Sequence, residues 1–329
     1  MRYLITGGSG FVGSHLCDAL TALGHRVTVL DNLATGRLSN IEHLVADGRV
    51  EFVEGSACDE LVVDELVRKC DHVMHLASAV GVQLIVDNPL DTMLSNVRGI
   101  DVVLGAAARH GKRTLFTSTS EVYGKHTNGA LSEDADLIIG SPSKSRWSYA
   151  IAKSFGEAVA AGYHAQGAEI VTVRLFNAVG PRQTGRYGMV VPRFVQQALA
   201  GEQLTVHGDG QQTRCFTHVL DSVRAILMLT VHDGAPGRTF NIGNGIQVSV
   251  RDLADRVIAR TASDSQIQFI PYEDAYAPGF EELGIRRPDT SALCGLTGWT
   301  PVLTLDHAID DVIAHERGVI APRLVEYAA

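Results

Sequence analysis

The sequence predicts an α/β protein with a doubly wound, mainly parallel sheet and a smaller C-terminal lobe. Strand-like apolar runs alternate with helix-period segments through the first half of the chain, and this alternation requires crossover connections between parallel strands. After about Val179 glycine, proline and arginine interrupt the alternation, which indicates a less regular second unit. The chain has 329 residues and 45% hydrophobic content, enough for one large core or two packed lobes.

The first half is expected to hold six strands separated by four principal helices. Short strand-like runs such as RYLIT and RVTVL predict strands at residues 2–6, 26–30, 50–53, 72–76, 113–118 and 169–174. Helical segments between them are expected at residues 11–23, 60–68, 91–110 and 149–166. Strand, helix and strand at this spacing predict right-handed βαβ units.

The second half is expected to form most of a ligand-carrying lobe. Helices are predicted at residues 190–200, 219–231, 249–261 and 304–316, with short strands near 204–206 and 239–241. We therefore divide the chain into a cofactor domain at 1–178 and a mainly substrate-binding lobe at 179–329. The strand at 239–241 either stays in that lobe or returns to the sheet.

The composition argues against several classes of protein. The formal net charge is −9 with no block of like charges, so there is no basic surface for nucleic acid. No apolar run approaches the ~20 residues that span a bilayer, and a strand at residues 2–5 leaves no room for a signal peptide. Five scattered cysteines without a CxxC motif indicate a reduced, cytoplasmic protein, and no cluster has the spacing of a metal site.

A glycine-rich turn follows the first predicted strand. Gly7, Gly10 and Gly13 stand three residues apart, directly before a helix that begins with Phe11 and Val12. The first glycine permits a tight turn, the second admits a pyrophosphate and the third lets helix and strand pack closely. Asp31 ends the second strand, where a carboxylate binds ribose hydroxyls and repels a 2′-phosphate. This pattern predicts a Rossmann-type domain that binds NAD.

A second motif, YAIAK at residues 149–153, predicts the chemistry. Tyr149 and Lys153 are one helical turn apart and share a face. A nearby lysine cation, together with the positive nicotinamide ring of NAD⁺, brings the pKa of a phenol down from about 10, so the phenolate acts as a base. Thr119, at the end of a predicted strand, is placed to orient the same substrate hydroxyl. The three residues indicate hydride abstraction from a carbinol carbon.

These motifs together resemble the extended short-chain dehydrogenase/reductase superfamily of nucleotide-sugar enzymes. The resemblance implies further cofactor contacts at Asn32, Leu76, Ala77, Ser78 and Val179, with support from Asn96. It also implies substrate contacts at Asn177, Arg193 and Arg214, since arginine forks suit phosphate oxygens. In the superfamily, the helices predicted at 91–110 and 149–166 form a dimer interface, so a homodimer is expected.

The segment TSTSEVYG at 117–124 raises the question of what Glu121 does. A 4,6-dehydratase needs a carboxylic acid directly after Thr119, where this chain has Ser120. A 4-epimerase needs only space for the 4-keto intermediate to rotate in the site, so that reaction does not require Glu121. A non-catalytic, NAD-sensing protein has no use for the poised phenolate of Tyr149. A carboxylate near the substrate would instead suit loss of CO₂ from a 4-keto uronic acid, a β-keto acid.

A closer resemblance follows from three segments: TSTSEVYG, the stretch that ends in RWSYAIAK, and YAPGFEELGIRRPD at 276–289. They are similar to the UDP-glucuronate decarboxylases, including the UDP-xylose synthases. The resemblance implies oxidation at C4 of UDP-glucuronate, then decarboxylation at C5, giving UDP-4-keto-pentose, UDP-xylose or both. It implies that Glu121 and Arg286 form the decarboxylation pair and that Ser120 contacts substrate. Phe280 replaces a Tyr found near the substrate in one relative. A UDP-sugar 4-epimerase stays the alternative.

Overall fold

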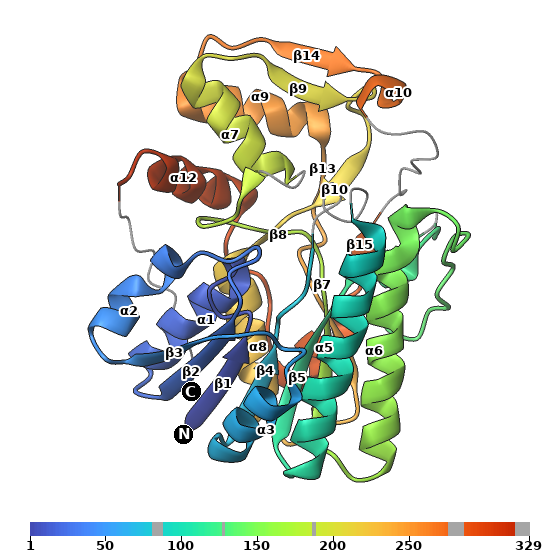
Figure 1. Ribbon diagram of the computed structural model, residues 1–329. Coiled ribbons are helices and arrows are strands. Elements are labelled where there is room, and N and C mark those ends of the chain that lie inside the picture. The colour runs from blue at the N-terminus through green and yellow to red at the C-terminus, as the bar shows by residue number, and fades with distance from the viewer. Residues whose placement is uncertain (81–87, 127–128, 186–188, 276–285, 320–329) are drawn as a thin grey trace.

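A seven-stranded parallel sheet forms the centre of the computed structural model, which describes residues 1–80, 88–126, 129–185, 189–275 and 286–319 (Figure 1). Its strands are β1 (Arg2–Thr6), β2 (Arg26–Asp31), β3 (Val50–Glu54), β4 (His72–His75), β5 (Arg113–Thr119), β7 (Ile170–Leu175) and β12 (Thr239–Ile242). They lie in the order β12-β7-β5-β4-β1-β2-β3. The predicted fold class is confirmed, and the strand near 239–241 joins the edge of the sheet beside β7. Phe280 and most of 276–289 lie outside the described residues.

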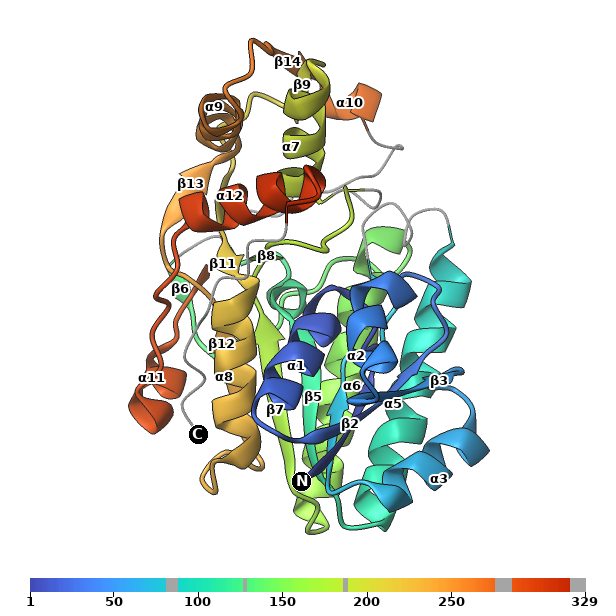
Figure 2. The same ribbon diagram turned by 90° about the vertical axis from the view of Figure 1, so that its left-hand side faces the viewer.

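Helices cover both faces of the sheet (Figures 1 and 2). One face carries α1 (Phe11–Ala22) and α8 (Val219–Val231), with α2 (Glu42–Ala46) and α11 (Ser291–Thr297) nearby. The other face carries α3 (Glu60–Lys69), α5 (Pro89–Arg109) and α6 (Ser148–Ala165). Fully buried valine, leucine and isoleucine side chains fill the layers on both faces of the sheet. Because each central strand is covered on both faces, its sequence is a nearly continuous apolar run.

A smaller lobe stands at the carboxyl edge of the sheet. Its helices are α7 (Val190–Ala200), α9 (Val250–Thr261) and α12 (Leu305–Glu316), which enclose a core of their own. Paired beside them are β9 (Leu204–His207) with β14 (Ile267–Ile270), and β10 (Thr213–Cys215) with β13 (Gln247–Ser249); α10 (Tyr272–Ala275) follows β14. The chain passes from the sheet into this lobe, returns for α8 and β12, and leaves again (Figure 2).

Two short strand pairs connect the sheet to the segments above it. They are β8 (Ala178–Val179) with β11 (Thr217–His218), and β6 (Ala130–Leu131) with β15 (Arg287–Pro288). Single 3₁₀ turns also occur in the described part of the chain, at η1 (Leu38–Asn40), η2 (Ser120–Tyr123) and η3 (Ser145–Trp147). Among the described residues, no helix is long and apolar enough to span a membrane.

The strand order fixes where a ligand binds. From β1 the chain proceeds outward to β2 and β3 on one side, and later strands extend from β4 on the other. The order therefore reverses between β1 and β4, and the crevice outside the carboxyl ends of these strands is the usual ligand site of such sheets.

Candidate active site

One cavity of about 810 Å³ occupies the crevice at the carboxyl edge of the sheet. Every site residue predicted from the sequence lines it: Gly7, Gly10, Phe11, Val12, Gly13, Asp31, Asn32, Leu76, Ala77, Ser78, Thr119, Ser120, Glu121, Tyr149, Lys153, Asn177, Val179, Arg193, Arg214 and Arg286. The residues come from nearly the whole length of the chain. The volume of the cavity lies in the range of cofactor and substrate sites.

The glycine turn between β1 and α1 has the close packing expected of a pyrophosphate cradle. Gly7 has a φ of +76°, a conformation that favours glycine. A Cβ atom on Gly13 would lie 2.3 Å from the Gly7 carbonyl oxygen, so a side chain has no room there. Gly10 caps α1 without a side chain, which leaves the helix N-terminus suited to an anion.

Asp31 lies at the end of β2 on the other side of this turn. Its carboxylate accepts hydrogen bonds from the backbone N–H groups of Ser9 and Leu33, each at 2.9 Å. Burial raises the pKa of this carboxyl, although the two backbone donors oppose the increase. A carboxylate fixed in this way has lone pairs left for ribose hydroxyls, so the glycine turn and Asp31 fit the adenosine half of NAD.

The loop after β4 forms the cavity wall between the cofactor end and the chemical end. Asn96 of α5 holds the loop: its Oδ1 accepts from the Ser78 hydroxyl at 3.0 Å and from the Ala79 N–H at 2.8 Å. Its Nδ2 donates to the Ala79 carbonyl at 3.1 Å. Asn96 therefore positions Ser78 beside the Tyr149 hydroxyl.

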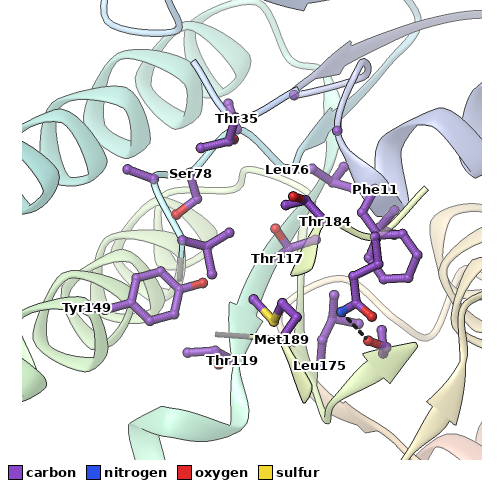
Figure 3. Close-up of a pocket in the computed structure, with 18 of the residues that line it drawn as sticks. Phe11, Thr35, Leu76, Ser78, Thr117, Thr119, Tyr149, Leu175, Thr184 and Met189 are labelled. Atoms are coloured by element: carbon purple, nitrogen blue, oxygen red, sulfur yellow. Dashed lines mark hydrogen bonds between the residues drawn. The ribbon is translucent and has the colours of Figure 1, made fainter. Parts of the chain in front are cut away.

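Figure 3 shows the Tyr149 hydroxyl pointing into the cavity between Ser78 and Thr119, with Phe11 on the opposite wall. Lys153 is buried one turn along α6, and its Nζ donates to the Thr117 carbonyl at 2.8 Å. Burial lowers the pKa of Lys153 to about 7, opposed by the charge of Glu157. Thr119, Tyr149 and Lys153 all line the same cavity, with Tyr149 and Lys153 one turn apart on α6.

The surroundings of Tyr149 oppose the effect expected from Lys153. Burial raises the pKa of the phenol, the negative charge of Glu121 raises it further, and the hydrogen bond with Ser78 lowers it. The lysine Nζ lies 5.8 Å from the centre of the Tyr149 ring and donates to a carbonyl instead. Ionisation of Tyr149 therefore depends on positive charge brought to the cavity by the cofactor.

Glu121 sits in η2, directly after β5, with arginines on two sides. Nη1 of Arg146 donates to its Oε2 at 2.5 Å, and Nη1 of Arg286 lies 3.7 Å from its Oε1. All three side chains are largely buried. Burial raises the pKa of the Glu121 carboxyl, but the charges of Arg146, Arg286 and Arg214 outweigh it and hold the pKa below its usual value. Glu121 is therefore an ionised carboxylate inside a positively charged group.

The role of Arg146 as the partner of Glu121 is a feature that sequence reasoning missed. The sequence identified Arg146 only as part of a motif before Tyr149, because 25 residues separate it from Glu121. The 3₁₀ turn η3 places its guanidinium beside the end of β5. The available signal was an arginine next to Trp147, directly before the helix of Tyr149, since an arginine buried at such a position requires a partner.

The remaining predicted residues lie toward the smaller lobe. Asn177 has a φ of +33°, and its Nδ2 donates to the Cys215 carbonyl at 2.9 Å, so part of its amide binds the chain itself. Arg193 donates to the Thr205 carbonyl at 3.1 Å and faces His207. Nη1 of Arg214 donates to the Thr213 carbonyl at 2.8 Å. His207 also lines the cavity and was not predicted.

Comparisons with known proteins agree with the predicted fold and cofactor. Residues 3–243 match the NAD dependent epimerase/dehydratase family. The chain is 40% identical over 313 residues to UDP-N-acetyl-α-D-glucosaminuronate decarboxylase of Bacillus cytotoxicus, covering 95% of this chain and 96% of the relative. It is 37% identical over 315 residues to UDP-glucuronic acid decarboxylase 1 of Danio rerio, covering 95% and 72% respectively. Among solved structures, UDP-glucuronic acid 4-epimerase from Bacillus cereus, in complex with UDP-glucuronic acid and NAD, superposes with a TM-score of 0.85 at 28% identity, covering 97% of this chain and 99% of that one.

Proposed function

This chain belongs to the NAD dependent epimerase/dehydratase family, as its resemblance to the extended short-chain dehydrogenases/reductases predicts, and from that premise we propose that it is a UDP-glucuronate decarboxylase. The observation that carries the proposal is the position of Glu121, held between Arg146 and Arg286 and two residues after Thr119. Oxidation at C4 alone does not require such a group. Loss of a carboxylate next to the new ketone is a step in which Glu121 can take part.

The first step is oxidation of the C4 hydroxyl. Bound NAD supplies the acceptor for the C4 hydride. Tyr149 takes the hydroxyl proton, and Thr119 orients that hydroxyl by a hydrogen bond. Lys153 adds positive charge one helical turn away, and the Ser78 hydroxyl lies within hydrogen-bond reach of the phenol. Thr119, Tyr149 and Lys153 come from β5 and α6, which suits the alignment that hydride transfer needs.

The second step breaks the bond between C5 and the carboxylate carbon. Its electron pair enters an enolate at the C4 oxygen, and CO₂ leaves. The negative charge of Glu121 repels the neighbouring substrate carboxylate and so raises the energy of the ground state. Arg146 and Arg286 stabilise the negative charge of the enolate. Burial lowers the pKa of Arg286 to about 10, so its guanidinium is a better proton donor to C5 than a free arginine. Return of the hydride to C4 gives UDP-xylose; release before return gives UDP-4-keto-pentose.

Both parts of the chain take part in this proposal. We assign NAD to the domain at 1–178, and the nucleotide sugar mainly to the lobe at 179–329, where Arg193 and Arg214 line the cavity; Asn177 lines it from the end of the first domain. We propose a cytoplasmic protein, because all five cysteines, which lie in the described part of the chain, are free thiols. We also propose a homodimer through α5 and α6, which carry exposed leucine and phenylalanine side chains.

A second substrate is favoured by a specific observation. The decarboxylase from Bacillus cytotoxicus acts, by its name, on an N-acetylated uronate, and its 40% identity exceeds the 37% of the Danio rerio enzyme. UDP-N-acetylglucosaminuronate is therefore the second candidate for the same reaction. A UDP-glucuronate 4-epimerase is the alternative reaction, supported by the structural likeness to the Bacillus cereus enzyme.

Incubation of the purified chain with each UDP-uronate, with and without added NAD⁺, tests the proposal. Mass spectrometry is expected to detect a product lighter by one CO₂ with at least one of the two substrates. Glu121→Gln and Arg286→His are expected to retain NAD and lose turnover, and Tyr149→Phe is expected to lose C4 oxidation. Full activity in both Glu121→Gln and Arg286→His would remove the assigned roles.

A further inference from the structure

Asn241 lies outside the cavity, yet it bonds to both segments that carry the proposed decarboxylation pair. It is fully buried on the edge strand β12, where it pairs in register with Arg174 of β7. A buried asparagine needs partners for its donors and acceptors. Asn241 finds them on three different segments, so it connects parts of the chain that the sheet itself does not join.

The first connection reaches the segment of Glu121. The Tyr123 hydroxyl donates to Oδ1 of Asn241 at 2.8 Å. Tyr123 ends η2, the same 3₁₀ turn that carries Glu121, and its ring lies 4.7 Å from the Arg174 guanidinium. The position of Tyr123 therefore fixes the orientation of the turn that presents the Glu121 carboxylate.

The second connection reaches the segment of Arg286. Nδ2 of Asn241 donates to the Asp289 carbonyl at 3.0 Å and to the Leu131 carbonyl at 2.8 Å. The Asp289 N–H donates to that same Leu131 carbonyl at 2.9 Å. Asp289 follows β15, which begins one residue after Arg286 and pairs with β6. The Asn241 amide thus binds Asp289, which is three residues from Arg286. It also binds Tyr123, which is two residues from Glu121.

A third contact fixes Asn241 itself. Its backbone N–H donates to Oε1 of Glu133 at 2.8 Å, and the Glu133 carbonyl accepts from Arg174 at 3.0 Å. Two residues further along, a Cβ on Gly243 would lie 2.6 Å from Pro288, so the chain of β15 packs tightly against this edge of the sheet. The hydrogen bonds and the close packing both fix β15 against the edge of β12.

We propose that Asn241 is a positioning residue that sets the spacing between Glu121 and Arg286, so that it acts on loss of CO₂ rather than on oxidation at C4. This inference rests on the proposed function. Tyr149 and Lys153 are held by α6 and Thr119 by β5, although the Thr119 hydroxyl also accepts from the Glu121 N–H at 3.3 Å; none of the three hydrogen-bonds to Asn241 among the described residues. Separate effects on the two steps are therefore expected.

The test compares Asn241→Asp and Asn241→Leu with the wild-type chain in single-turnover reactions with NAD⁺ and the UDP-uronate that the wild type accepts. Asp keeps the acceptor for Tyr123 but places an oxygen opposite two carbonyls; Leu removes every side-chain bond. Because small displacements of reacting groups slow a step on the order of 100-fold, CO₂ release is expected to fall about 10- to 100-fold. Absorbance at 340 nm, which follows oxidation at C4, is expected to appear at close to the wild-type rate.

Two further variants separate positioning from simple loss of stability. Tyr123→Phe removes one hydrogen bond and keeps the ring, so it is expected to slow the same step less, even if the Asn241 variants fold poorly. Thr230→Val removes a buried hydroxyl that donates to the Ile226 carbonyl within α8 rather than to this network, and is expected to slow neither step.

The outcomes are distinct. Equal slowing of oxidation and CO₂ release in the Asn241 variants and in Tyr123→Phe would overturn the inference alone, as would unchanged CO₂ release. No CO₂ from the wild-type chain with either uronate would overturn the proposed function, and the inference with it.

Discussion

Glu121 is the residue on which the proposed chemistry depends, and its charge state is set by its neighbours. Arg146 donates to it at 2.5 Å and Arg286 lies at 3.7 Å, which outweighs the cost of burial and holds the pKa of the carboxyl below its usual value. The same charge raises the pKa of Tyr149. Arg146 therefore affects both steps: it keeps Glu121 ionised and partly cancels the field of Glu121 at the phenol.

Replacing Arg146 with glutamine is expected to shift the pH dependence of turnover. A depressed carboxyl pKa keeps Glu121 ionised, and activity that needs the carboxylate is lost as pH falls through that pKa. Removing the charge of Arg146 raises the pKa of the Glu121 carboxyl. The pH below which kcat falls is therefore expected to increase by on the order of one unit. The measurement is kcat against pH. Arg224→Gln, which breaks a pair with Asp221 in α8, is the matched control and leaves that limb unchanged; an unmoved limb in both variants contradicts the pairing.

At the scale of elements, the turn between β1 and α1 is where NAD is expected to bind. Gly13 is inside the first turn of α1 and faces the carbonyl of Gly7 at a distance that excludes a methyl group. Gly162 is in the last part of α6 with no atom within 4 Å of an added Cβ. Both glycines are in helices, but a methyl group would meet backbone atoms at Gly13 and open space at Gly162.

Gly13→Ala is expected to lower NAD affinity on the order of tenfold or more, because backbone atoms must move to admit the methyl group. Gly162→Ala is expected to keep NAD affinity and raise the free energy of unfolding by up to about 1 kcal/mol, since alanine favours helix. Calorimetric titration with NAD and urea unfolding measure the two effects. Equal affinities for the two variants would contradict the cradle at Gly13.

At the scale of the whole molecule, the two helices α5 and α6 pack side by side on one face of the sheet (Figure 1). Leu94 of α5 and Phe155 of α6 keep 58% and 39% of their surface exposed. Apolar groups at this exposure on neighbouring helices fit a contact between two copies of the chain.

Leu94→Glu is expected to turn the proposed dimer into a monomer, because it places a charge in the apolar contact. Leu61→Glu is the matched control: Leu61 is 84% exposed on α3, a different helix, and the change is expected to leave the dimer intact. Sedimentation velocity reports the mass of each variant. Dissociation by the Leu61 change, or none by the Leu94 change, contradicts an interface on α5 and α6.

Much of this fold was predictable because its signals are local. The glycine turn, Asp31 and the YAIAK motif each lie within a short stretch, and the strands and long helices match their expected ranges within a few residues. The short helix α11 and the return of β12 to the sheet depend on packing with distant segments. The pairing of Glu121 with Arg146 and the bonds of Asn241 to Tyr123 and Asp289 span 25 to 118 residues, so no local pattern predicts them.

The most direct test of the central claim follows the carboxyl carbon itself. UDP-glucuronate labelled at C6 with heavy carbon is incubated with the chain and NAD⁺ and observed by carbon NMR. The account predicts that the label moves from the sugar carboxylate to CO₂ and bicarbonate, and that Glu121→Gln suppresses the transfer while retaining NAD. A label that stays in the sugar, with a shift characteristic of the C4 epimer, would contradict decarboxylation and leave Glu121 with another role.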